Sequence, residues 1–302
     1  IIPLINYIGF GISSILIFLL SKNIFGHIHA IIGTLFWMTY PFLLWIMKQP
    51  NTEIPFIVFL YSSLYTFFNS QLIKNSRRMR FYLFLSGFFL GIAVLIRPIG
   101  IAIILVYTIY LLFTNIILEK SNIKPQCIAV LFILIGFIVS IGPWEYWVYK
   151  KTGKVVPIST VKNLAIIDGL QFGIKSKNYR KDFHLPQDVV SLMHNIKTTI
   201  NDNNDLILEE ILFEEFTNTP ISFIKLAVIK SARSWYGTDS GSFENQIIAI
   251  QLIYIGLIIL GCFKSWQLSI RARLWVILST LITIYFWTMT IMVLSILRYM
   301  VP

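Results

Sequence analysis

The chain contains eight stretches, each about 20 residues long, that consist almost entirely of apolar residues. A helix rises about 1.5 Å per residue, so a stretch of this length spans a bilayer core of roughly 30 Å. The composition agrees, because 56% of the residues are hydrophobic and only 13% are charged, whereas about 25% are charged in soluble domains. Backbone polar groups inside lipid must be satisfied within the segment, which favours helices. The sequence therefore predicts an all-α polytopic membrane protein with about eight transmembrane helices and one helical extracytoplasmic loop region.

One long polar stretch separates the sixth predicted span from the seventh. The spans cover residues 3–21, 30–47, 54–73, 81–97, 98–118, 126–144, 246–263 and 274–297. The polar stretch is too long for a turn and too polar to cross lipid. We therefore expect six spans in 1–149, an extracytoplasmic loop region over 150–245 and two further spans in 246–302.

The charges of the connecting loops predict the orientation. The loops 22–29, 74–80, 119–125 and 264–273 hold ten basic residues against one acidic residue, Glu119. The basic residues are Lys22, Lys74, Arg77, Arg78, Arg80, Lys120, Lys124, Lys264, Arg271 and Arg273. Such an excess marks cytoplasmic loops. The stretch 150–245 holds twelve basic and eleven acidic residues and is therefore expected outside.

The net charge of +11 does not indicate nucleic-acid binding, because much of the positive charge lies in the short loops between spans. Abundant Ile, Lys and Asn suggest a bacterial source, and hence the inner membrane. Cys127 and Cys262 fall near the cytoplasmic side, where free thiols are expected. His27 and His29 are more typical of a polar loop than of a metal site.

Residues 81–118 form a run that is too long for one span and is interrupted by Arg97-Pro98. Proline lacks an amide donor and disfavours helix at the residue before it. We therefore expect two helices that meet in a tight turn at the outer face. Gly87 and Gly91 are spaced to let a neighbouring helix approach closely.

Four polar fragments lie at span ends that the topology places on the outer face: Thr52-Glu53, Arg97-Pro98, Pro143-Trp144-Glu145 and Arg298-Tyr299. Each has a structural explanation alone. The first is typical of a helix N-terminus, and the arginines can reach lipid headgroups. The aromatic residues fit an interfacial belt. A functional explanation is a cationic site, because a guanidinium binds phosphate through parallel hydrogen bonds.

The lysine cluster after the sixth span, Lys150, Lys151 and Lys154, admits the same two explanations, a phosphate site or a solvated surface. Within the outer stretch, 205–216 and 220–235 show helical apolar spacing. The second of these helices either lies in the membrane interface or packs on the protein's own surface.

In order along the chain, these fragments resemble the GT-C membrane glycosyltransferases, and among them the protein mannosyltransferase and aminoarabinose transferase-like family. The similar segments are 40–53, the run GFFLGIAVLIRP at 87–98, the run PWEYWVYKKTGKVVPIST at 143–160, and RYMVP at 298–302. Many members of the family have Arg-Asn where this chain has Trp147-Val148, so no ligand role carries over to those two positions.

The resemblance implies an inverting transfer of a sugar from a polyprenyl-phosphate donor to a glycan, lipid or protein acceptor at the outer face, without nucleic acid. It implies donor-phosphate binding by Arg97, Arg298 and, more weakly, Lys151. Glu53, Glu145, Trp144 and Tyr299 would shape the pocket. Some relatives use a divalent metal, and no cofactor is assigned here.

The family's catalytic acid lies in the first outer loop, which corresponds to a position upstream of Ile1, so no catalytic residue is assigned. We expect residues 1–302 alone to be inactive for that reason. Two rival functions stay open: a transporter or lipid flippase, and a non-catalytic envelope assembly protein with the same fold. An acidic residue in the first outer loop of the full reading frame would count against the second rival.

Overall fold

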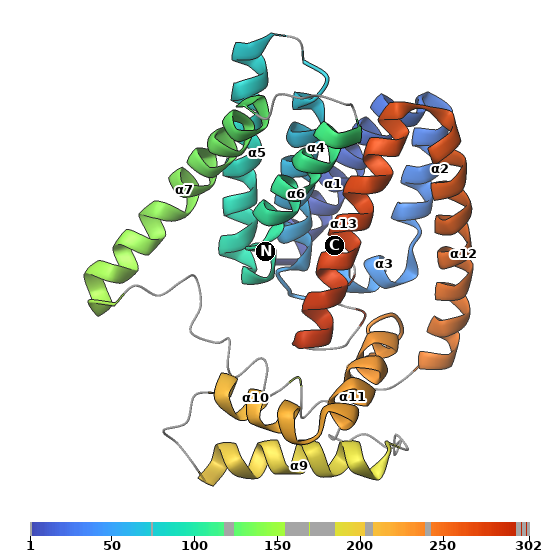
Figure 1. The fold of residues 1–302 in the computed structure, drawn as a ribbon. Helices are drawn as coiled ribbons and strands as arrows, with labels where there is room; N and C mark the ends of the chain where they lie inside the picture. Colours follow the sequence, from blue (N-terminus) through green and yellow to red (C-terminus); the bar gives the residue numbers. More distant parts are fainter. Residues whose placement is uncertain are drawn as a thin grey trace. The chain divides into compact units, whose positions relative to one another are not determined.

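The computed structural model describes residues 2–73, 75–117, 124–154, 169, 185–202, 208–238, 243–293, 297 and 300, and these residues contain no strand. The helices follow one another along the chain as shown in Figure 1. They are α1 (Ile2–Phe25), α2 (His27–Met38), α3 (Pro41–Lys48), α4 (Glu53–Ser70), α5 (Ser76–Ile96), the 3-10 turn η1 (Pro98–Gly100), α6 (Ile103–Ile117), α7 (Lys124–Thr152), α9 (Gln187–Asp202), α10 (Leu208–Asn218), α11 (Pro220–Arg233), α12 (Glu244–Leu268) and α13 (Ile270–Met292).

Within the described residues, five helices are long and apolar enough to cross a membrane: α1, α5, α7, α12 and α13. The bent pair α2 and α3 would make a sixth span. The predicted all-helical membrane fold is thus confirmed. The finer count of eight spans stays a prediction, because α4, with 18 residues, is not among the helices that are both long and apolar enough, and Pro98–Thr114 is shorter.

The predicted span over 30–47 is two helices rather than one. α2 and α3 meet at an angle of 56°. Pro41 opens α3, and Tyr40 before it adopts an extended backbone with φ −62° and ψ 113°. The residue before a proline is pushed out of the helical region, so the chain bends here.

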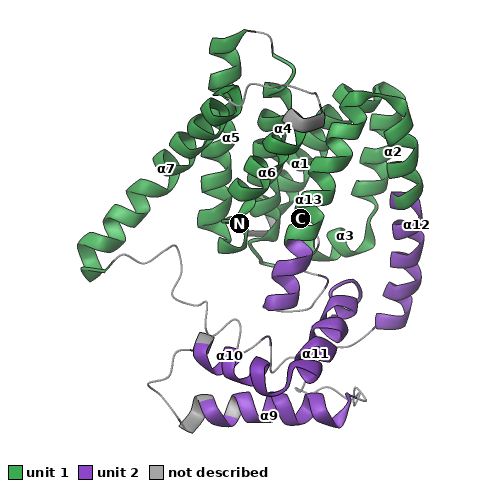
Figure 2. Ribbon diagram, in the orientation of Figure 1, with its two compact units in different colours: residues 1–159, 259–285, 301–302 green, residues 160–258, 286–300 purple. Residues whose placement is uncertain are grey.

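The chain forms two compact units, coloured separately in Figure 2. Unit 1 comprises residues 1–159, 259–285 and 301–302, and unit 2 comprises 160–258 and 286–300. The domain boundaries expected from topology, after residues 149 and 245, rest on membrane side rather than on compactness and stay predictions.

In unit 1, α5 packs between α4 and α7, and its contact with α7 is a close approach of two backbones. A Cβ atom on Gly87 would collide with the carbonyl of Ile133, and one on Gly136 with the carbonyl of Phe84. A Cβ on Gly91 would lie 2.7 Å from Ser140 Cβ. The predicted role of the glycine pair is therefore confirmed, and α7 is the helix that it admits.

A buried polar cluster joins α4, α5 and α6. The Ser63 hydroxyl lies 2.8 Å from the Ser86 carbonyl oxygen and 2.9 Å from the Tyr107 hydroxyl. The Tyr107 ring stacks on Phe67 with centroids 4.1 Å apart. Because the three polar side chains satisfy one another, they can be buried in a membrane bundle at little cost.

In unit 2, α9, α10 and α11 share an apolar core. Its buried residues are Val189, Leu192, Met193, Ile196, Ile211 and Leu226. The helices predicted over 205–216 and 220–235 appear as α10 and α11, within the described residues, while α9 was not predicted. Leu226 of α11 faces this core, whereas Ile221, Ile224 and Val228 are exposed. One side of α11 thus packs on the protein, and the apolar side chains of its other side are exposed.

We predict that Gly87→Ala destabilises the protein, because the new methyl group collides with a backbone carbonyl that cannot rotate away. Overpacking of this kind costs about 1–3 kcal/mol. Gly142→Ala is the matched control on α7, since nothing lies within 4 Å of its added Cβ. Thermal unfolding in detergent measures both variants, and equal midpoints would contradict the close crossing of α5 and α7.

Candidate functional site

Glu53 and Arg97 form a buried ion pair in unit 1. Arg97 Nη1 lies 2.7 Å from Glu53 Oε1, and the two side chains are 13% and 1% exposed. Glu53 opens α4 and Arg97 directly follows α5, so the pair joins two helix ends. Two of the four predicted polar fragments are therefore in direct contact.

The position of Arg97 follows from the proline after it. Arg97 adopts an extended backbone with φ −142° and ψ 112°, and its amide still donates to the Ala93 carbonyl at 2.8 Å. The 3-10 turn η1 then runs from Pro98 to Gly100 before α6 begins at Ile103. The predicted tight turn between two helices is confirmed. It projects the guanidinium from the end of α5 toward the start of α4.

Tyr285 of α13 holds the same turn. Its hydroxyl donates to the Ile99 carbonyl and accepts from the Ala102 amide at 3.3 Å. These two contacts fix the segment that immediately follows Arg97. The sequence offered no signal for this role, because Tyr285 is one of several aromatic residues in a long apolar run.

Glu53 was expected at a helix N-terminus, and it is the first residue of α4. Thr52 occupies the capping position without a side-chain capping hydrogen bond. The structural explanation of the Thr52-Glu53 fragment is therefore incomplete. The carboxylate also benefits from the positive end of the helix dipole, but its described partner is the arginine.

Burial of this pair costs free energy for both charged side chains. Removing two charges from water is expensive, and removing one member of a buried pair typically costs about 3–5 kcal/mol. A guanidinium carries five N–H donors in a planar fork, which suits it to carboxylate and phosphate oxygens together. The arrangement can therefore hold an arginine in one orientation while part of it remains accessible.

The other predicted residues of the described chain lie at the end of α7, which continues through Pro143 to Thr152. These last turns project from the bundle in Figure 1. Trp144 is 46% exposed and stacks on Trp147 with ring centroids 5.2 Å apart. Lys151 is exposed and Glu145 is half-buried. The structure thus pairs Glu53 with Arg97 and leaves Trp144 and Lys151 on an exposed helix end.

Arg298 and Tyr299 lie outside the described residues, so their predicted roles stay predictions. Neither His27 nor His29 belongs to a group of three possible metal ligands among the residues that were described. His27 lies edge-on to Phe18, with centroids 5.6 Å apart. The His29 ring bonds to the Phe25 carbonyl at 3.0 Å.

Unit 2 holds a second buried ion pair that the sequence did not single out. Arg233 Nη2 lies 3.1 Å from Glu244 Oε1, and both side chains are 8% exposed. The Thr238 amide donates to the same carboxylate oxygen at 3.1 Å. Arg233 is the last residue of α11 and Glu244 the first residue of α12, so the pair joins these two helix ends.

Lys230 lies one helical turn before Arg233 and is also buried. Its ammonium donates to the Val293 carbonyl at 3.3 Å. Burial lowers the pKa of Lys230 from 10.5 to about 8, because the charged form loses hydration. On the exposed side of the same helix, the Lys225 ammonium 2.7 Å away lowers the pKa of Asp188.

Residues 2–147 match a family model described as dolichyl-phosphate-mannose-protein mannosyltransferase. This part of the chain is similar to that family. The match contains Glu53, Arg97, Trp144 and Glu145 and ends before Lys151. It confirms the resemblance inferred from the motifs and indicates a multi-pass membrane glycosyltransferase. No curated protein and no solved structure matches the chain.

We predict that Lys230→Met stabilises the protein at pH 7. A pKa lowered from 10.5 to about 8 corresponds to about 3 kcal/mol, offset by about 1 kcal/mol for the lost hydrogen bond. The unfolded chain binds more protons than the folded chain between pH 8 and 10.5, so wild-type stability rises through that window. The advantage of the variant is therefore full below pH 8 and gone above 10.5.

Denaturant unfolding followed by tryptophan fluorescence measures this difference, because Trp235 and Trp287 lie in the same unit with ring centroids 5.8 Å apart. Lys225→Met is the control, since that lysine is 49% exposed. A constant difference between Lys230→Met and wild type from pH 7 to 10.5 would contradict the lowered pKa.

Proposed function

We propose that this protein transfers a sugar from a polyprenyl-phosphate donor to an envelope acceptor at the extracytoplasmic face of the membrane. The observation that carries the proposal is the buried Arg97, held by Glu53 at the end of a membrane helix inside the family-matched segment. A lipid-linked donor presents its phosphate at this depth, where its tail remains between apolar helices. An arginine at the same depth supplies the matching charge.

In the proposed reaction, a hydroxyl of the acceptor attacks the anomeric carbon of the sugar. The bond from that carbon to the phosphate oxygen breaks, and the electron pair leaves with the polyprenyl phosphate. A general base takes the acceptor proton. Arg97 would donate hydrogen bonds to the phosphate oxygens as their negative charge increases.

Glu53 would act as a positioning residue. Its carboxylate accepts a hydrogen bond from one edge of the guanidinium and thereby restricts how Arg97 can turn. A held guanidinium loses little further freedom when phosphate binds, which favours the bound state. In this proposal Arg298 and Lys151 add further positive charge, and Trp144, Glu145 and Tyr299 line the sugar or acceptor side.

The matched family is one of sugar transferases, which favours a transferase over the transporter or flippase alternative. The matched segment also contains the Glu53–Arg97 ion pair on which the proposal rests. The non-catalytic alternative keeps the same fold and predicts no turnover in any variant. The inner membrane of a bacterium is the proposed location.

We predict that Arg97→Ala in the full-length protein lowers sugar transfer by at least about 100-fold, the usual effect of losing one preorganised donor to a developing anion. Arg97→Lys should retain part of the rate, because it keeps the charge but not the planar fork. Transfer of labelled sugar from a polyprenyl-phosphate donor in proteoliposomes measures both. The amount of protein in the membrane fraction shows that insertion is intact.

Arg271→Ala is the matched control for this prediction, since Arg271 is an exposed arginine in the first turn of α13. It should transfer sugar at the wild-type rate. Normal turnover by Arg97→Ala would refute the phosphate role. Wild-type protein that is inert with every lipid-linked donor would favour the non-catalytic alternative.

We predict that Val190→Cys is modified from outside the cell by an impermeant maleimide. Val190 is 41% exposed on α9, within the stretch expected outside. A single-cysteine protein that keeps only Cys127, which is exposed, serves as the opposite reference. Cys127 should react only after the membrane is opened. The reverse order of labelling would overturn the orientation inferred from loop charges.

A further inference from the structure

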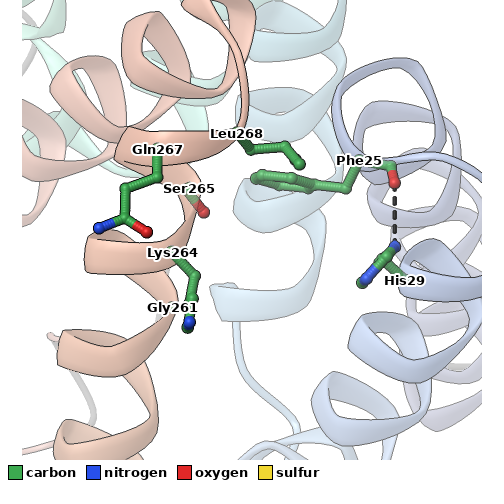
Figure 3. A pocket seen from close by; sticks show the side chains of 7 residues that line it. All are labelled: Phe25, His29, Gly261, Lys264, Ser265, Gln267 and Leu268. Carbon is green, nitrogen blue, oxygen red and sulfur yellow. Dashed lines mark hydrogen bonds between the residues drawn. The ribbon is translucent and has the colours of Figure 1, made fainter.

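A second polar site lies in unit 1, between the junction of α1 with α2 and the last turns of α12. It is a cavity of about 680 Å³, drawn in Figure 3. The residues that line it are Phe25, His29, Gly261, Lys264, Ser265, Gln267 and Leu268. All of them belong to the same compact unit.

The lining divides into a cationic, hydrogen-bonding part and an apolar part. Lys264, Ser265 and Gln267 supply an ammonium, a hydroxyl and an amide, while Phe25 and Leu268 supply apolar surface. No acidic side chain lines the cavity in the described residues. A negatively charged group can therefore meet Lys264 here without first displacing a carboxylate.

His29 adds a second ring nitrogen to this lining. Its Nδ1 lies 3.0 Å from the Phe25 carbonyl oxygen, which can only accept, so Nδ1 carries a proton. Figure 3 shows that the other nitrogen of the ring points away from this carbonyl. An imidazole nitrogen that carries a proton donates a hydrogen bond to an anion.

The cavity lies at the opposite end of the bundle from the Glu53–Arg97 pair. The Asn6 amide near the start of α1 donates to the Gln49 carbonyl at 2.7 Å, close to Glu53. Near the other end of α1, the Asn23 amide donates to Asn69 at 3.0 Å, at the end of α4. Since α1 closes at Phe25, the cavity belongs to this second end, where lipid headgroups meet the helix termini.

An apolar surface leads away from the cavity along α12. Leu257, Leu260, Phe263 and Leu268 are between 46% and 63% exposed on this helix. The flanking segments 22–29 and 264–273, where helices end and begin, contain Lys22, Lys264, Arg271 and Arg273 and no acidic residue. A ligand that suits both features carries a phosphate on an apolar chain.

We propose that this cavity binds the phosphate of an anionic phospholipid of the membrane, with Lys264 and His29 as the principal contacts. The phosphate lies between the ammonium and the imidazole, and the acyl chains follow the exposed apolar side of α12. A free phosphate ion would satisfy the same cations but would make no use of the apolar surface. The site is separate from the proposed donor site and does not depend on sugar transfer.

The test compares lipid binding by wild-type protein and by Lys264→Gln. Full-chain protein is titrated in nanodiscs of phosphatidylcholine that contain increasing phosphatidylglycerol, and bound lipid is counted by native mass spectrometry. Lys264→Gln should weaken phosphatidylglycerol binding about tenfold, because it removes one charge-assisted contact to the phosphate. His29→Phe should weaken it by a smaller factor. Both side chains are exposed, so the substitutions leave the core unchanged.

Lys22→Gln is the matched control, since it removes the same charge from the same end of the bundle but does not line the cavity. It should bind phosphatidylglycerol as wild type does. Equal weakening by Lys22→Gln and Lys264→Gln would mean diffuse attraction and would overturn the site. Displacement of the lipid by millimolar inorganic phosphate would assign the cavity to a soluble anion and would also overturn the proposal. Loss of sugar transfer without loss of lipid binding would concern the donor site alone.

Discussion

The ion pair between Glu53 and Arg97 is the interaction on which the packing of the start of α4 against the end of α5 depends. The pair connects residues 44 positions apart in sequence, and its glutamate is 1% exposed. Burying either charge alone would cost much free energy. The start of α4 and the end of α5 can therefore pack together in the protein interior only if both charges are present and aligned. Functional arginines near lipid face the same requirement, because a charge that waits for a ligand must be stabilised before the ligand arrives.

Two features on either side of Arg97 keep the pair aligned. Before it, the glycines of α5 allow α7 to approach so closely that a single methyl group at Gly87 would meet backbone. After it, Pro98 ends α5 and Tyr285 holds the following turn through both a donated and an accepted hydrogen bond. The arginine thus lies at a junction whose backbone is restrained from two directions.

The sequence predicted best what is determined locally. The break at Arg97 follows from Pro98 itself, and the close contact of α5 follows from the absence of a Cβ at Gly87.

Contacts between distant segments were less predictable. Glu53 and Arg97 were both chosen as site residues, but their pairing depends on how α4 and α5 lie side by side. The Arg233–Glu244 pair and the two hydrogen bonds of the Tyr285 hydroxyl were not predicted. Each depends on a tertiary contact that leaves no local pattern in the sequence. Pro41 is a local signal for the bend after Tyr40. The segment 30–47 was nevertheless predicted as one span because it is apolar throughout.

The two ends of the bundle in unit 1 differ in how their cations are balanced. At the Glu53–Arg97 end, a carboxylate lies 2.7 Å from the guanidinium, so in the proposed phosphate role selectivity would rest on the direction of the guanidinium N–H groups as well as on charge. At the Lys264–His29 end, no carboxylate lines the cavity among the described residues, so attraction rests on charge and on adjacent apolar surface. The first arrangement suits a reaction, because geometry can be matched to a transition state. The second suits retention of a lipid, whose headgroup needs attraction more than orientation.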